Sequence, residues 1–215
     1  MTGVRIGRRD MSASRAGIFA VCGLMAGLVS ASAAPVSAGL IRGLRQGCYV
    51  LVMRHASSPA TPPVQSAADP ENTGLERQLD EKGRKSAEAM GRAFKALRIP
   101  VGEIFSSPTY RARETIKLAG FGAPKTVAQL GDQGHSMARL NGPGPAAWLK
   151  GEVTMRPAFG HDTLIVTHMP NIAAAFPDDA AGLQDGETLV FKPDGHGHAS
   201  MVVRVPIEDW TSSVP

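Results

Sequence analysis

Two uninterrupted apolar runs constrain the fold of this chain most strongly. Residues 50–52, Val-Leu-Val, lead through Met53 into Arg54 and His55, and residues 164–166, Leu-Ile-Val, lead through Thr167 into His168. A continuous rather than alternating apolar run is typical of a strand buried on both faces of an α/β sheet. Such strands deliver their last residues to the edge where open α/β sheets bind ligands. We therefore expect both histidines at one ligand-binding edge.

Helix and strand signals alternate along the rest of the chain. Apolar residues at three-to-four spacing predict an amphipathic helix over residues 81–97, with Asp80 as its N-cap. A short strand at residues 104–105 turns into a helix over residues 109–118. We also expect a short helix at 145–150 and strands at 126–130, 163–167, 187–192 and 201–205, the last two joined by a hairpin loop. The pattern predicts an α/β fold.

The first 38 residues differ in character from the rest. Arginines at positions 5, 8, 9 and 15 precede an uncharged run over residues 16–29, and small residues follow it. The run is too short to cross a membrane, for which about 20 apolar residues are needed. A basic start, an apolar middle and an Ala-x-Ala ending are typical of a cleaved secretory signal, general or twin-arginine; a membrane-anchoring helix is the alternative. We expect a signal peptide over residues 1–38 and one exported domain over residues 39–215, periplasmic or extracellular, without a stable membrane anchor.

Export changes how charge and cysteine content are interpreted. The chain has a net charge of +4, but residues 1–38 carry four arginines and one aspartate, so residues 39–215 carry only +1. The basic balance therefore belongs to the signal and does not indicate nucleic-acid binding. Cys22 lies within the signal, which leaves Cys48 without an internal disulfide partner.

A third polar motif follows the predicted strand at residues 104–105. Residues 106–108, Ser-Ser-Pro, lead into the next helix, with Pro108 expected in its first turn, where a missing N–H is tolerated. Arg111 then lies near the start of this helix and faces the same sheet edge as His55. Simple helix capping by the serines is the alternative explanation.

Together these motifs resemble the histidine phosphatase superfamily, also called the phosphoglycerate mutase-like family. The resemblance covers about residues 48–206 and is carried by Arg54-His55, residues 79–84, residues 106–115, and residues 164–168 followed by Asn171. Met169 after His168, and the absence of room for large lid insertions, favour the mutase-like branch. The resemblance implies a three-layer α/β/α sandwich with a mostly parallel central sheet.

The resemblance also implies a role for each site residue. His55 would be the nucleophile that becomes phosphohistidine, and Arg54, Arg111 and His168 would hold the phosphoryl group, with Asn171 near the substrate. Guanidinium groups suit this because they stay charged and donate bidentately to phosphate. A neutral imidazole is a competent nucleophile near neutral pH, so no metal or cofactor is expected.

The proton donor for the leaving group is the weakest part of the pattern. The family usually provides a Glu or Asp after the third strand, where this chain has Gly-Asp-Gln at residues 131–133. Asp132 is the nearest candidate, with His135 close by; an exposed turn aspartate is the alternative. Without an acid, a substrate with a good leaving group is favoured.

We therefore expect an exported, metal-independent phosphatase. It would hydrolyse a small phosphomonoester, or a similar phosphorylated compound, through a phosphohistidine on His55. The alternative is a catalytically weak or inactive domain that binds phosphorylated ligands. His196 and His198 provide two metal ligands at most, too few for a usual metal site.

Overall fold

The computed structural model describes residues 1–3, 35–59, 74–132 and 144–215. The chain divides into two units, Met1–Ser32 and Ala33–Pro215, and the helices and strands that the structure describes belong to the second. The predicted signal peptide lies mostly outside the described residues, as does His135. Within the described part, no helix is both long and apolar enough to cross a membrane.

A six-stranded sheet forms the centre of the second unit. Its order is β3-β2-β4-β1-β5-β6. The strands are β1 (Val50–Arg54), β2 (Val101–Ser106), β3 (Lys125–Thr126), β4 (Asp162–Thr167), β5 (Thr188–Pro193) and β6 (Ala199–Val205). The strands from β3 to β1 pair in parallel, whereas β5 runs antiparallel to β1 and β6.

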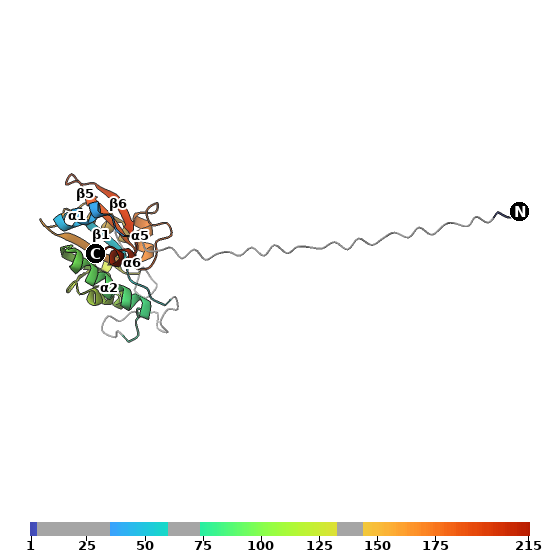
Figure 1. Ribbon diagram of the computed structural model, residues 1–215, viewed down its shortest axis with the longest axis horizontal. Helices are drawn as coiled ribbons and strands as arrows, with labels where there is room; N and C mark the ends of the chain where they lie inside the picture. The colour runs from blue at the N-terminus through green and yellow to red at the C-terminus, as the bar shows by residue number, and fades with distance from the viewer. Residues whose placement is uncertain (4–34, 60–73, 133–143) are drawn as a thin grey trace. The chain divides into compact units, whose positions relative to one another are not determined.

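Helices cover both faces of this sheet (Figure 1). They are α1 (Ala38–Gln46), α2 (Glu81–Leu97), α3 (Tyr110–Ala119), α4 (Pro145–Glu152), α5 (Met169–Ala175) and α6 (Ile207–Ser212). Alternate residues of β1 point to opposite faces: Leu51 and Met53 pack with α1, α2, α3 and α6, whereas Val50 and Val52 pack with α4 and α5. The three-layer α/β/α prediction is confirmed.

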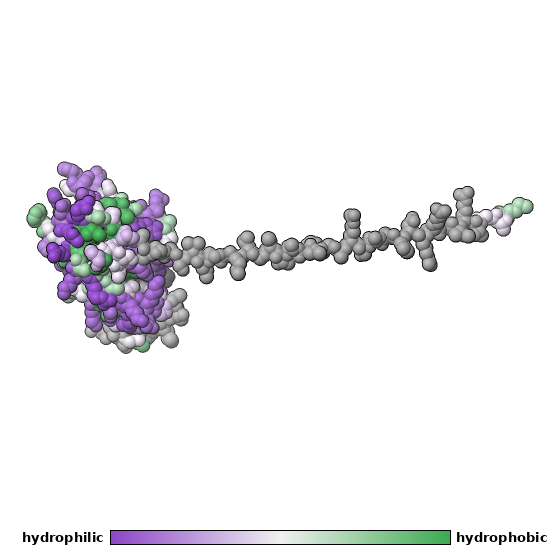
Figure 2. All heavy atoms as spheres, viewed as in Figure 1, coloured by the Kyte–Doolittle hydropathy of each residue, from purple (hydrophilic) through white to green (hydrophobic). Residues whose placement is uncertain are grey.

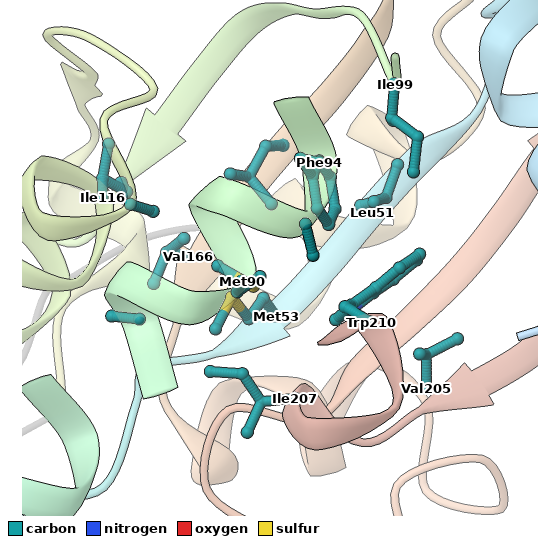
Figure 3. Close-up of a cluster of buried hydrophobic side chains, with 14 of the residues drawn as sticks. Leu51, Met53, Met90, Phe94, Ile99, Ile116, Val166, Val205, Ile207 and Trp210 are labelled. Carbon is teal, nitrogen blue, oxygen red and sulfur yellow. The ribbon is translucent and has the colours of Figure 1, made fainter. Parts of the chain in front are cut away.

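Helix α2 shows how the sequence specifies one of these layers. The Asp80 carboxylate accepts the Gly83 N–H at 2.7 Å and so caps the helix, as predicted. On its buried face, Phe94 packs edge to face against Trp210 of α6 with ring centroids 4.7 Å apart, and Figure 3 shows both in one cluster with Met53 and Met90. The outer face of α2 is hydrophilic in Figure 2. Its apolar stripe therefore faces the sheet, as the periodicity predicts.

Gly91 of α2 lets α3 approach closely. A Cβ at this position would lie 2.0 Å from the carbonyl oxygen of Ala119, so any larger residue would push the two helices apart. This approach matters because α3 carries Arg111.

The structure corrects two expectations near the site. The strand predicted at residues 126–130 is wrong, because strand β3 consists of Lys125–Thr126 and Ala128–Leu130 forms a 3₁₀ turn that places Leu130 in the core. Pro108 is not in the first turn of α3, which begins at Tyr110 after Thr109. Three short helices, α1, α5 and α6, have no counterpart in the sequence expectations.

Candidate active site

The ends of β1 and β4 bring two histidines together. The strands pair in parallel with Arg54 opposite Thr167, so His55 and His168 follow at equivalent positions. Both side chains are buried, and their ring centroids lie 5.2 Å apart. The parallel register therefore produces the shared edge that the two apolar runs predict.

Arg111 links both histidines. Its Nε donates to His55 Nε2 at 3.2 Å, and its Nη2 lies 3.1 Å from His168 Nδ1. The same Nη2 pairs with the Asp132 carboxylate at 3.0 Å, and the Arg111 side chain is only 3% exposed. The structure thus places four of the predicted site residues in direct contact.

His55 is held neutral in a defined orientation. Its Nδ1 lies 2.8 Å from the carbonyl oxygen of Ala56, which can only accept, so the proton is on Nδ1. Nε2 then carries the lone pair, on the side facing Arg111. Burial, followed by the charge of Arg111, lowers the pKa of His55 from 6.5 to about 3. The imidazole is therefore a neutral base at physiological pH.

The turn before α3 orients His168. His168 Nε2 lies 2.8 Å from Ser107 Oγ and 3.3 Å from Thr109 Oγ1. Because Arg111 can only donate to Nδ1, the ring donates from Nε2 to these hydroxyls. Ser107 also accepts the N–H of Thr109 at 3.2 Å. The Ser-Ser-Pro motif thus combines local turn formation with a contact to His168.

Arg54 is anchored by the loop before β5. Its Nη1 donates to the Leu183 carbonyl oxygen at 2.9 Å, and its Nη2 pairs with Asp185 Oδ1 at 2.6 Å. Its Nε is buried and has no hydrogen-bond partner among the described residues. The sequence interpretation did not identify Asp185.

Arg77 is a further cation that the sequence interpretation missed. Its positive charge acts on His55, and its Nη2 donates to the Ser58 carbonyl oxygen at 3.3 Å. Burial, and then repulsion from Arg111, lowers the pKa of Arg77. The sequence contained one signal for Arg77: it lies three residues before Asp80, the N-cap of α2.

These arginines present donors that lack partners. Arg54 Nε, Arg77 Nε and Arg111 Nη1 are buried without a hydrogen bond among the described residues. Buried donors are costly when unpaired, and three guanidinium groups repel one another. An oxyanion with several acceptor oxygens would satisfy both the donors and the charge.

Asp132 and Asn171 form a second layer beneath Arg111. Asp132 is buried, which excludes the exposed-turn alternative. The Asn171 amide donates to the carbonyl oxygens of Leu130 and Gly131 at 3.0 and 2.7 Å, and to Thr167 Oγ1 at 2.9 Å. The Asn171 donor is therefore occupied by the backbone that leads to Asp132.

Comparison with known proteins gives one family match within the chain. Residues 50–132 match the model of the histidine phosphatase superfamily (branch 1). Over these residues the chain is similar to the histidine phosphatase superfamily. A search of curated proteins found no match.

Several solved structures have a similar fold. One is the protein histidine phosphatase SixA complexed with tungstate, with a TM-score of 0.53, 15% identity, and coverage of 75% of this chain and 98% of SixA. A SixA protein from Agrobacterium tumefaciens has a TM-score of 0.51 and 16% identity, covering 74% of this chain and 97% of that one. A phosphoserine phosphatase variant from Entamoeba histolytica, in complex with phosphoserine, has a TM-score of 0.50 and 15% identity, covering 75% and 98%. At these identities the likeness shows the fold.

Two further features of this domain bear on its chemistry. Glu76 is buried and accepts the Tyr110 N–H at the start of α3, and burial raises its pKa. The N–H groups of His196 and His198 both donate to Asp194 Oδ1, which shapes the loop between β5 and β6. Among the described residues, no group of three or more His, Cys, Asp or Glu side chains could hold a metal ion.

Proposed function

We propose that this domain is an exported, metal-independent phosphatase that uses His55 Nε2 as its nucleophile. One observation carries the proposal: the neutral His55 directs its lone pair toward Arg111, beside buried guanidinium donors that lack partners. A base surrounded by unpaired cationic donors is suited to attack an anionic phosphoryl group.

The reaction would proceed in two displacements. The Nε2 lone pair of His55 attacks phosphorus, and the bond from phosphorus to the leaving group breaks with its electron pair. Arg111 and Arg54 stabilise the charge on the phosphoryl oxygens. Water then attacks phosphorus, the P–N bond breaks, and the electron pair returns to Nε2. Phosphate leaves and the proton of the attacking water passes to solvent.

Binding of the phosphoryl group must free the nucleophile. In the structure, the N–H of Arg111 Nε occupies the Nε2 lone pair of His55 at 3.2 Å. A phosphoryl oxygen is a stronger acceptor for a guanidinium than a neutral imidazole. We propose that a substrate oxygen replaces His55 as the acceptor of the hydrogen bond from Arg111 Nε–H. The lone pair on His55 Nε2 is then free for attack.

The position of Asp132 narrows the substrate class. Its Oδ2 pairs with Arg111 Nη2 at 3.0 Å, so we propose that this carboxylate holds the guanidinium in place and does not protonate a leaving group. We therefore propose a phosphorylated compound whose leaving group needs little protonation: a phosphomonoester of an acidic alcohol, or a phosphorylated histidine. The similarity to the protein histidine phosphatase SixA supports the second possibility.

Hydrolysis of p-nitrophenyl phosphate tests the proposal. Residues 35–215 would be assayed with a chelator present, beside His55→Ala and the matched control His198→Ala, which changes an exposed histidine. We expect the wild type and the control to release phosphate at equal rates, and His55→Ala to release none above background. Equal activity in His55→Ala would refute the nucleophile, and activity only after added metal would refute metal independence. Tungstate binding without turnover would indicate a domain that binds phosphorylated ligands without hydrolysing them.

A further inference from the structure

The loop over residues 181–187 lies against Arg54. Arg54 directs Nη1 to Leu183 and Nη2 to Asp185 in this loop. The main chain of this loop also contacts the end of β1: the Arg54 N–H donates to Glu187 O at 3.1 Å, and the Gly186 N–H donates to His55 O at 3.0 Å. One side of the guanidinium thus faces the loop, while Nε remains for a ligand.

Arg204 on β6 holds the loop in place. Its Nε and Nη2 donate to the two carboxylate oxygens of Glu187, each at 2.8 Å, and its Nη1 donates to Ala181 O at 2.7 Å. Glu187 also accepts the Gln184 N–H at 2.8 Å. Burial opposes ionisation of Glu187, but the bonds from Arg204 and Gln184 outweigh it and hold its pKa below the usual value. A bidentate ion pair therefore fixes the loop from Ala181 to Glu187.

Asp185 places a negative charge beside a site built for anions. Its side chain is 31% exposed and pairs with Arg54, and the charge of Arg77 acts on it as well. This carboxylate competes with an oxyanion for the same guanidinium groups, so it should weaken anion binding. Packing alone does not explain an acidic side chain here, because Asp185 is partly exposed.

We propose that Asp185 is a positioning residue that orients Arg54 toward the phosphoryl group, and that the Glu187–Arg204 pair holds the loop carrying Asp185. The inference rests on the proposed phosphatase function. According to this inference, the Asp185 carboxylate raises kcat and at the same time weakens the binding of oxyanions, compared with a protein that lacks this charge.

Asp185→Asn separates these two effects. The variant keeps the shape of the side chain but removes the charge that fixes Arg54. We expect kcat for p-nitrophenyl phosphate to fall about tenfold, because a displaced guanidinium stabilises the transition state less. The Kd for tungstate should fall several-fold, because the competing carboxylate charge is gone. Asp178→Asn, an exposed aspartate of the preceding segment, is the matched control and should change neither value.

The pH profile gives a second readout. Burial raises the pKa of Asp185, while Arg54 and Arg77 oppose the rise; Asp80 raises the pKa and Lys82 lowers it. Protonation of Asp185 should act like the substitution, so wild-type kcat should decline on the acid side. We expect Asp185→Asn to lack this decline. A loss of folded structure would not abolish one limb of a pH profile.

Glu187→Gln tests the support of the loop. We expect it to lower kcat in the same direction as Asp185→Asn, with the double variant losing less than the product of the single losses, because both act through Arg54. Kinetic constants of Asp185→Asn within twofold of wild type would overturn the proposal, as would parallel loss of kcat and tungstate binding. If the wild type proves inactive, tungstate binding still decides: tighter binding by Asp185→Asn supports the competing charge, and unchanged binding contradicts it.

Discussion

Replacing His55 by glutamine should remove an acid-dependent loss of stability. Folding lowers the pKa of His55 from 6.5 to about 3, mainly through burial and then through Arg111. The unfolded chain therefore binds a proton as pH falls below 6.5, whereas the folded protein does not until about pH 3. The stability that depends on neutral His55 is thus fully present above pH 6.5 and is lost as pH falls toward 3.

The size of the effect follows from the linkage relation. At pH about 4.5, two units below the unfolded pKa, His55 alone should reduce the free energy of unfolding by about 3 kcal/mol relative to pH about 7.5. Glutamine does not titrate, so the difference in unfolding free energy between His55→Gln and wild type should shift by that amount in favour of the variant.

Urea unfolding at the two pH values measures this shift. His198→Gln, which changes an exposed histidine, controls for the substitution itself. A difference between His55→Gln and wild type that stays constant with pH would show that His55 protonates equally in both states. The account of a neutral, preorganised nucleophile would then fail.

Three other substitutions test the surrounding structure. Arg111→Lys keeps the charge but cannot contact His55, Asp132 and His168 at once, so kcat/KM for p-nitrophenyl phosphate should fall about 100-fold; a change under threefold would contradict the role of the guanidinium. Asp162 is buried and its pKa is raised to about 7 by burial, so its own contribution to the free energy of unfolding should decline as pH rises from about 4 to 7, and Asp162→Asn should gain up to about 4 kcal/mol relative to wild type over that range; a difference between variant and wild type that stays the same at both pH values would refute this. Ser37 caps α1 by accepting the Leu40 N–H at 3.2 Å, so Ser37→Ala should lower the free energy of unfolding by about 1 kcal/mol; no change in the urea midpoint would contradict the cap.

The capping contact also bears on the export prediction. Ser37 caps α1, and the Val36 N–H donates to Ser213 Oγ at 2.6 Å. Both residues lie before position 39, where the mature domain was expected to start. A chain cleaved after the small residues at 31–34 would keep both contacts. N-terminal sequencing of the protein isolated from cells tests both the proposed cleavage and its position.

The buried strands were the most predictable part of the fold. The runs ending at His55 and His168 indicated their burial directly, and the N-cap at Asp80 fixed the start of α2 to the residue. Residues 126–130 misled because their apolar side chains fit a short strand as well as the 3₁₀ turn that buries Leu130. Local pattern cannot distinguish these when the run is only five residues long.

The site residues were predictable only where they lie at the end of a strand or the start of a helix. His55, Arg111 and His168 each sit at the end or start of one, so their meeting followed from topology. Arg77 and Asp185 lie on loops, and their positions depend on paths that periodicity does not encode. The contact of Asn171 with the backbone before Asp132 was also hidden, because its amide donates to the carbonyl oxygens of Leu130 and Gly131, which no side-chain motif records.

Trapping the phosphoenzyme tests the central claim most directly. The protein would be mixed with p-nitrophenyl phosphate, quenched in denaturant at alkaline pH, where phosphohistidine persists, and digested for mass spectrometry. We predict one added phosphoryl group on the peptide containing His55, located on its imidazole, and none in His55→Ala. Full turnover with no phosphorylated His55 peptide at any quench time, or the same label in His55→Ala, would contradict the phosphohistidine mechanism.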